Sequence, residues 1–144
     1  MGRVSICLAL AVLLGVVTSL AADPPVATCP VSGGPISKEA AVDYRGGKLY
    51  FCCPICPAKF DENKAKYAAK ANLQLVQTGQ AVQKACPLTG GKTNPATAIK
   101  VAGVSVAFCC NGCKGKVTKV SAKEQLETVF GEKGFDKAFA VKGQ

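Results

Sequence analysis

The chain has no histidine and no tryptophan, and its only methionine is Met1. Without histidine, haem attachment through Cys-x-x-Cys-His is excluded, and the commonest general acid or base of enzymes is missing. The acidic residues of the predicted helices are expected on solvated helix faces; they include Asp61, Glu62, Glu124 and Glu127. The sequence therefore predicts that the protein is not an enzyme.

Aromatic residues are also scarce, with six phenylalanines and three tyrosines in 144 residues. Each half of the chain can therefore bury only a small apolar core. A unit of roughly 55 residues is marginally stable on hydrophobic burial alone and usually needs a disulfide or a metal ion. The nine cysteines are the obvious supplement.

The first residues have the pattern of a secretory signal peptide. Arg3 precedes an apolar run, and small side chains at Ser19 and Ala21 suit a cleavage site after residue 21. We expect 1–21 to be the signal peptide, 22–28 a short linker, and the protein to be exported to the periplasm or the extracellular space. A retained membrane anchor is the less favoured alternative, because the run approaches spanning length. Cys7 lies in this run and has no partner set.

Positive charge exceeds negative charge, with 18 basic and 9 acidic residues and a net charge of +9. The simplest interpretation is a solvated lysine-rich surface. The alternative is attraction to anionic envelope polymers or lipid headgroups. Nucleic-acid binding is not predicted, because the lysines are dispersed and the protein is expected outside the cytoplasm. The sequence does not indicate an oligomeric state.

An internal duplication accounts for eight of the nine cysteines. Residues 29–60 align with 86–117 without a gap, and 11 of the 32 positions are identical. The identities are Cys29, Pro30, Gly33, Gly34, Ala41, Gly46, Phe51, Cys52, Cys53, Cys56 and Lys59 of the first copy. We therefore expect module 1 over 29–72, a linker or helix extension over 73–85, and module 2 with C-terminal helices over 86–144.

Each module is predicted to contain a turn, a β-hairpin, a cysteine cluster and a helix. The turn follows from a cysteine placed before paired glycines. In the first hairpin, pairing of Arg45 with Lys48 around Gly46-Gly47 puts the apolar residues on one face. These residues are Val42, Tyr44, Leu49 and Phe51, and their counterparts around Gly103-Val104 are Ile99, Val101, Val106 and Phe108.

Helical patterns follow both cysteine clusters. One helix is expected from about Ala58 to Ala71 with an extension toward Gln77, and the segment Leu73–Lys84 is either helical or extended. In the second copy we expect helices over 113–120, around Leu126–Phe130 and over 135–141. The predicted fold class is α+β, with two small treble-clef or zinc-ribbon-like modules.

Metal binding is the chemistry that these cysteines favour. Cys53-x-x-Cys56 and Cys110-x-x-Cys113 have a spacing that lets two thiolates face one ion. The candidate ligands are Cys29, Cys52, Cys53 and Cys56 in module 1 and Cys86, Cys109, Cys110 and Cys113 in module 2. Sulfur ligands suit Zn²⁺ or Cu⁺, with up to two ions per chain. In an extended strand, however, Cys52 and Cys53 point to opposite faces, so both can bind one ion only if the chain bends there.

Two other chemistries compete with metal binding. Eight cysteines in an exported chain also suit a disulfide-stapled envelope or surface interaction protein without metal. Against this alternative, adjacent cysteines rarely bond each other, and two identical quartets fit a site better than a set of staples. Thiol redox catalysis is less favoured, because thioredoxin-like motifs occur in a βαβ setting that this sequence does not show.

The spacing of Cys29, Cys52 and Cys56, with 22 and then three residues between them, resembles that of YHS and TRASH heavy-metal-binding domains. Cys86, Cys109 and Cys113 have the same spacing. The resemblance implies a treble-clef-related fold, a role in metal sensing, trafficking or resistance, and ligand roles for these six cysteines. It leaves the roles of Cys53 and Cys110 open.

Overall fold

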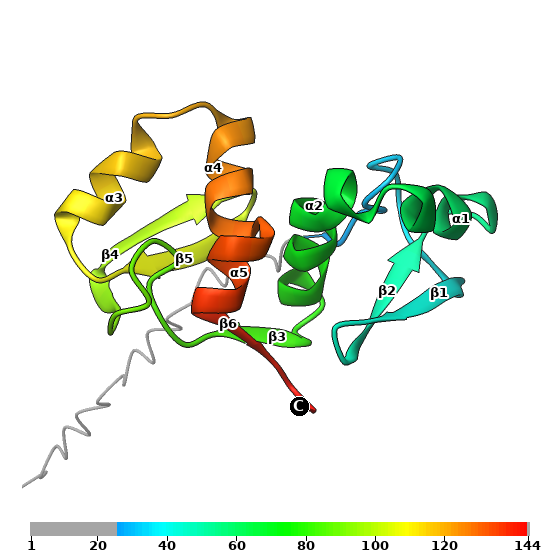
Figure 1. The fold of residues 1–144 in the computed structure, drawn as a ribbon, viewed down its shortest axis with the longest axis horizontal. Helices are drawn as coiled ribbons and strands as arrows, with labels where there is room; N and C mark the ends of the chain where they lie inside the picture. The colour runs from blue at the N-terminus through cyan, green and yellow to red at the C-terminus, as the bar shows by residue number, and fades with distance from the viewer. Residues whose placement is uncertain (1–25, 144) are drawn as a thin grey trace, which may run out of the picture.

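The computed structural model describes residues 26–143, so the expected signal peptide and Cys7 lie outside the described residues. The fold is α+β and contains two similar small modules, each with a cysteine cluster (Figure 1). Module 1 comprises β1 (Ser37–Tyr44), β2 (Gly47–Phe51), α1 (Ile55–Glu62) and α2 (Lys64–Gln77). Module 2 comprises β4 (Asn94–Val101), β5 (Val104–Phe108), α3 (Asn111–Thr118), α4 (Ala122–Phe130) and α5 (Glu132–Ala138). Within residues 26–143, no helix combines the length and apolar character needed to cross a membrane.

Both modules open with the predicted turn. The N–H of Cys29 donates to the carbonyl of Gly34 at 2.8 Å, and the N–H of Cys86 donates to that of Gly91 at 2.9 Å. Gly33 has a φ of 77° and its counterpart Gly90 a φ of 74°. Side chains other than glycine rarely adopt this left-handed conformation, which explains the glycine at this position of both copies.

The hairpins form as predicted, but the predicted turn positions are wrong by one residue. Tyr44 pairs with Gly47 and Val101 with Val104, so the turns are Arg45-Gly46 and Ala102-Gly103. All four turn residues have positive φ, as a type I′ turn requires. The shift preserves the predicted apolar faces, because moving a turn by one residue changes the pairing register by two. Gly47 is instead the first residue of β2, where an added Cβ would lie 2.9 Å from Gln80 Oε1.

The first helical stretch begins earlier than predicted and is broken. It starts at Ile55, and Asn63 separates α1 from α2. The φ of −148° at Asn63 is not helical, and its side chain accepts a hydrogen bond from the N–H of Lys66. Asparagine at an N-cap satisfies a free amide of the first turn, so it both ends α1 and starts α2.

Residues 73–85 contain the end of α2, a turn and a short strand, β3 (Ala81–Gln83). The last predicted helix, over 135–141, is partly wrong. Helix α5 starts at Glu132, and its predicted last residues form β6 (Phe139–Val141), which pairs antiparallel with β3. Strands of three residues that pair across about 60 residues have no local periodicity for the sequence to reveal.

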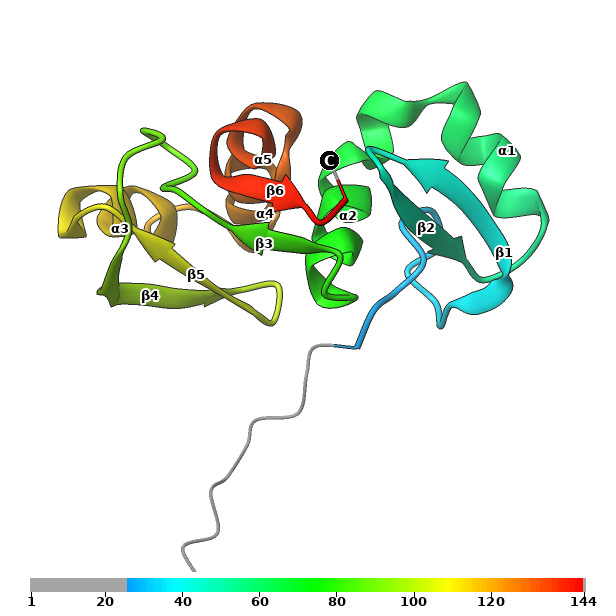
Figure 2. The ribbon, with the colours of Figure 1, turned by 90° about the horizontal axis from the view of Figure 1, so that it is seen from below.

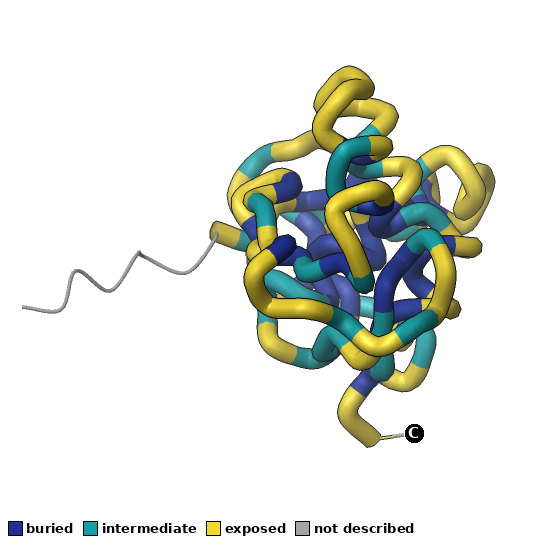
Figure 3. Tube along the Cα trace, turned by 90° about the vertical axis from the view of Figure 1, so that its left-hand side faces the viewer, coloured by how far each residue is buried: buried dark blue, intermediate teal, exposed yellow. Residues whose placement is uncertain are grey.

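Helix α2 lies between the rest of module 1 and module 2 in both ribbon views (Figures 1 and 2). Its buried residue Ala71 belongs to the core of module 1, whereas Leu73 and Leu75 belong to the larger core of module 2. Buried residues therefore continue through the centre of the molecule, with exposed residues on the outer loops and helices (Figure 3). The two modules share one packed body.

The turn of the first hairpin also contacts module 2. The guanidinium of Arg45 forms an ion pair with Asp136 and lies 5.3 Å from the centroid of the Phe135 ring. Both partners belong to α5. Arginine combines a planar charged group with an apolar stem, so a single side chain can supply both contacts.

Three glutamine amides close the free edges of the hairpins. Gln74 Oε1 accepts from the N–H of Tyr50, and its Nε2 donates to the carbonyl of the same residue, both at 2.7 Å. Gln80 makes the same pair of bonds with Lys48 of β2, and Gln83 makes it with Ala107 of β5. Each amide replaces a missing neighbouring strand. Within the described residues, no buried side-chain nitrogen or oxygen lacks a hydrogen-bond partner.

Candidate metal centres

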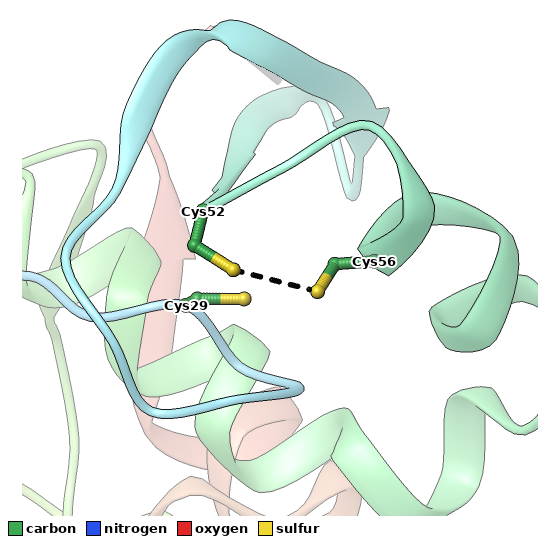
Figure 4. Close-up of side chains that lie close together, drawn as sticks. All are labelled: Cys29, Cys52 and Cys56. Carbon is green, nitrogen blue, oxygen red and sulfur yellow. Dashed lines mark hydrogen bonds between the residues drawn. The ribbon is translucent and has the colours of Figure 1, made fainter.

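Three cysteines of module 1 converge from three separate elements (Figure 4). Cys29 comes from the opening turn, Cys52 follows the last residue of β2, and Cys56 lies in the first turn of α1. Their sulfur atoms lie within 4.8 Å of one another. We call this group triad 1.

Module 2 builds the same arrangement as triad 2. Its members are Cys86 from the turn, Cys109 after β5 and Cys113 in α3, and their sulfurs also lie within 4.8 Å of one another. The structure thus brings together six of the eight predicted ligands in two equivalent groups, and each group is placed closely enough to hold a metal ion.

The end of each hairpin explains how the second cysteine reaches the triad. Phe51 and Phe108 are fully buried and fix the last strand residue against the core. The strand ends there, and the chain bends over the next two residues before the helix begins. Strand alternation therefore no longer applies to Cys52 and Cys53, which removes the geometric objection to their lying near one site.

The sulfur separations suit metal coordination. Cys52 Sγ lies 3.5 Å from Cys56 Sγ, and Cys109 Sγ lies 3.6 Å from Cys113 Sγ. Thiolates that bind one Zn²⁺ tetrahedrally at about 2.3 Å are about 3.8 Å apart. A disulfide requires about 2.05 Å instead, and all eight cysteines of the described range are free thiols.

The remaining cysteine of each module lies beside its triad. Cys53 Sγ is 3.5 Å from Cys56 Sγ, and Cys110 Sγ is 3.8 Å from Cys109 Sγ. Neither sulfur belongs to the mutually close group. Cys110 is the N-cap of α3, whereas Pro54 is the N-cap of α1. Helix α3 starts one aligned position earlier than α1, so the two cysteines hold different positions at the start of their helices.

Negative charge is distributed unequally within each triad. Burial by itself raises the pKa of Cys29, but hydrogen bonds from the Ser32 hydroxyl and from nearby backbone N–H groups lower that pKa to about 6. The same balance of burial against hydrogen bonds from Thr89 and nearby amides lowers the pKa of Cys86 to about 6. Burial, the neighbouring thiols and the charge on the turn cysteine raise the pKa of Cys56 and of Cys113 to about 12. In each metal-free triad, one thiolate is therefore hydrogen-bonded beside a thiol that keeps its proton.

This charge distribution predicts how proton release depends on pH. Binding an ion displaces the proton of Cys56 at any pH near neutrality, but it displaces that of Cys29 only below a pH of about 6. Ligand thiols must lose their protons, so the number of protons released per triad should fall by about one as pH rises through about 6. Calorimetric titration with metal in buffers of different ionisation enthalpy, at about pH 5 and about pH 7.5, measures this number. Equal proton release at both pH values would contradict the assignment.

A hydroxyl group near each triad was not anticipated from the sequence. Ser32 Oγ lies 3.2 Å from Cys52 Sγ, and Thr89 Oγ1 lies 3.4 Å from Cys109 Sγ. Groups that hydrogen-bond to metal ligands orient them and tune their basicity. The sequence contains a signal for this contact, because Ser32 and Thr89 occupy aligned positions in the two copies and both carry a hydroxyl.

Comparison with known proteins found no matching family model, no matching curated protein and no matching solved structure. The fold and its two cysteine groups therefore define the chain as a two-module α+β protein with two candidate metal centres. No family model supports the expected resemblance to YHS and TRASH domains.

Proposed function

We propose that this chain is an exported metal-handling protein that binds one thiophilic ion, Zn²⁺ or Cu⁺, in each module, and that it is not an enzyme. The observation that carries the proposal is the equivalence of the two triads. The same three aligned cysteines, from the same three kinds of element, converge in both modules. Repeated convergence of sulfur is expected when each copy holds its own ion.

The ligand set supports a soft ion. Each triad offers sulfur alone, and thiolates select Zn²⁺, Cu⁺ and similar ions over Mg²⁺ or Ca²⁺. Zn²⁺ normally takes four ligands, so it would recruit Cys53 or Cys110, or a water molecule. A three-coordinate ion such as Cu⁺ would use the triad as it stands. We also propose that the two modules are related to YHS and TRASH heavy-metal-binding domains.

Metal and thiol counts on the freshly purified protein test this function. We expect about two ions per chain, one for each triad, with most thiols reacting only after a chelator or acid removes the metal. The protein is purified without added reductant, so that any disulfides are preserved and can be counted. Four disulfides with no bound metal would establish the stapled interaction protein instead.

A further inference from the structure

In each module the cysteine outside the triad is at least partly exposed, and so is one triad member, Cys52 or Cys109. Cys29 and Cys86 are fully buried, and Cys56 and Cys113 are 6% and 7% exposed. Cys53 is partly exposed and Cys110 is exposed. A donor that carries an ion from outside therefore cannot touch the two most buried ligands of either triad directly.

The sulfurs of Cys53 and Cys110 lie close enough to a triad sulfur for one ion to contact both. Cys53 Sγ lies 3.5 Å from Cys56 Sγ, and Cys110 Sγ lies 3.8 Å from Cys109 Sγ. These separations resemble those within the triads, where 3.5 and 3.6 Å are found. An ion bound to Cys53 or Cys110 would therefore lie within reach of a triad sulfur.

Both cysteines lie where the chain turns from a strand into a helix. Cys110 is the N-cap of α3, and Cys53 directly precedes the N-cap of α1. Both copies place this cysteine beside its triad although their helix caps differ, so an accident of one loop does not explain the placement.

We propose that Cys53 and Cys110 are transfer ligands, which receive Cu⁺ from a thiolate-bearing carrier protein at the surface and pass it to the buried triad. This inference depends on the proposed function, because it describes how the same centres are loaded and emptied. It also assigns the partner: a protein that carries Cu⁺ on exposed cysteines.

The exchange balances without any change in oxidation state. The Cys53 sulfur bonds to the ion and gives up its proton, while one carrier thiolate leaves and takes a proton. The triad sulfurs then bind the ion, and Cys56 gives up the proton that it holds in the metal-free triad. The remaining carrier sulfur leaves and takes up a proton, and last the Cys53 sulfur leaves and regains one, with any difference in protons exchanged with the solvent. Copper stays Cu⁺ throughout, and reversal of the sequence returns the ion to a carrier. A triad with only three ligands leaves room for the incoming fourth sulfur.

Transfer kinetics test the proposal on the mature full-length protein. The double variant Cys53→Ser/Cys110→Ser is compared with the wild type under anaerobic reducing conditions, with the Cu⁺–glutathione complex as the donor. Stopped-flow mixing measures the rate, and competition with bicinchoninate measures the equilibrium affinity for Cu⁺. We expect transfer to slow by ~10-fold or more, which corresponds to about 1.4 kcal/mol of activation free energy. The affinity should change by less than ~3-fold, since the triad is intact.

Two results with the double variant would overturn the proposal. An unchanged rate would make Cys53 and Cys110 bystanders, and a fall in affinity of ~100-fold or more would make them permanent fourth ligands. The Ser105→Ala variant is the control, because it changes a hydroxyl at an exposed position of β5 that belongs to neither cysteine group; its transfer rate should stay near that of the wild type. Failure of the proposed function is distinguishable, because the wild-type protein would then bind neither Cu⁺ nor Zn²⁺, whereas binding of Zn²⁺ alone would overturn only the transfer role.

Discussion

Replacing Cys29 by serine is expected to empty triad 1 and leave triad 2 loaded, so that the metal content falls from two ions per chain to one. Cys29 is fully buried and is the one ligand that the opening turn of module 1 supplies. Structural zinc sites bind with about 10–16 kcal/mol in total. Loss of one thiolate should therefore weaken binding at that triad by at least ~100-fold.

Elemental analysis and competition titration of the purified variants measure this effect. Cys86→Ser should give the mirror result at triad 2, and the double variant should bind no ion tightly. Cys53→Ser is the comparison variant, because it removes a sulfur from module 1 and leaves the three triad cysteines in place. If Cys29→Ser retained two tightly bound ions, triad 1 would not be the metal site.

Removing the metal with a chelator is expected to destabilise the protein strongly, and module 1 more than module 2. A ligand present at about 1,000 times its Kd stabilises the folded state by about 4 kcal/mol. For a chain of this size, that corresponds to a fall in Tm of roughly 12–20 °C. The core of module 1 consists of Cys29, Ala40, Leu49, Phe51, Cys56, Phe60 and Ala71, so two of its members are triad cysteines. Module 2 belongs to the larger core, which α4 and α5 extend.

Hydrogen exchange before and after chelation distinguishes the two modules. The amides of β1 and β2 should lose protection first, whereas those of β4 and β5 should keep more of theirs. Re-addition of the ion should restore both. Equal stability with and without metal, measured under reducing conditions, would show that the ions contribute nothing to folding.

Much of the local architecture could be predicted because the same pattern of residues occurs in both copies. The apolar alternation around Leu49 and around Val106 agrees between the copies, and one register accounts for both hairpins. The same comparison located the turn cysteines and the cysteine clusters. It did not locate the hairpin turns correctly, because Gly46-Gly47 is a stronger local turn signal than Arg45-Gly46. The structure prefers the latter, since Gly47 lies close to Gln80 and Leu75.

The remaining features depend on contacts between segments that are distant in the sequence. Strands β3 and β6 exist only because they pair with each other. Gln74 has a polar side chain and would be expected at the surface, yet it is fully buried, because its amide completes the edge of β2. No periodicity within a single window contains this information. The strand pattern also could not predict that the Cys52 side chain turns toward the triad, because its direction depends on where β2 ends.

The glutamine contacts have a consequence for dividing the chain. Gln74, Gln80 and Gln83 all lie between the two aligned segments 29–60 and 86–117, so neither segment contains the groups that close its own strand edge. Either segment expressed alone would expose the open edge of its hairpin to other chains. A fragment of the protein therefore needs the stretch between the segments as well as its own cysteine cluster.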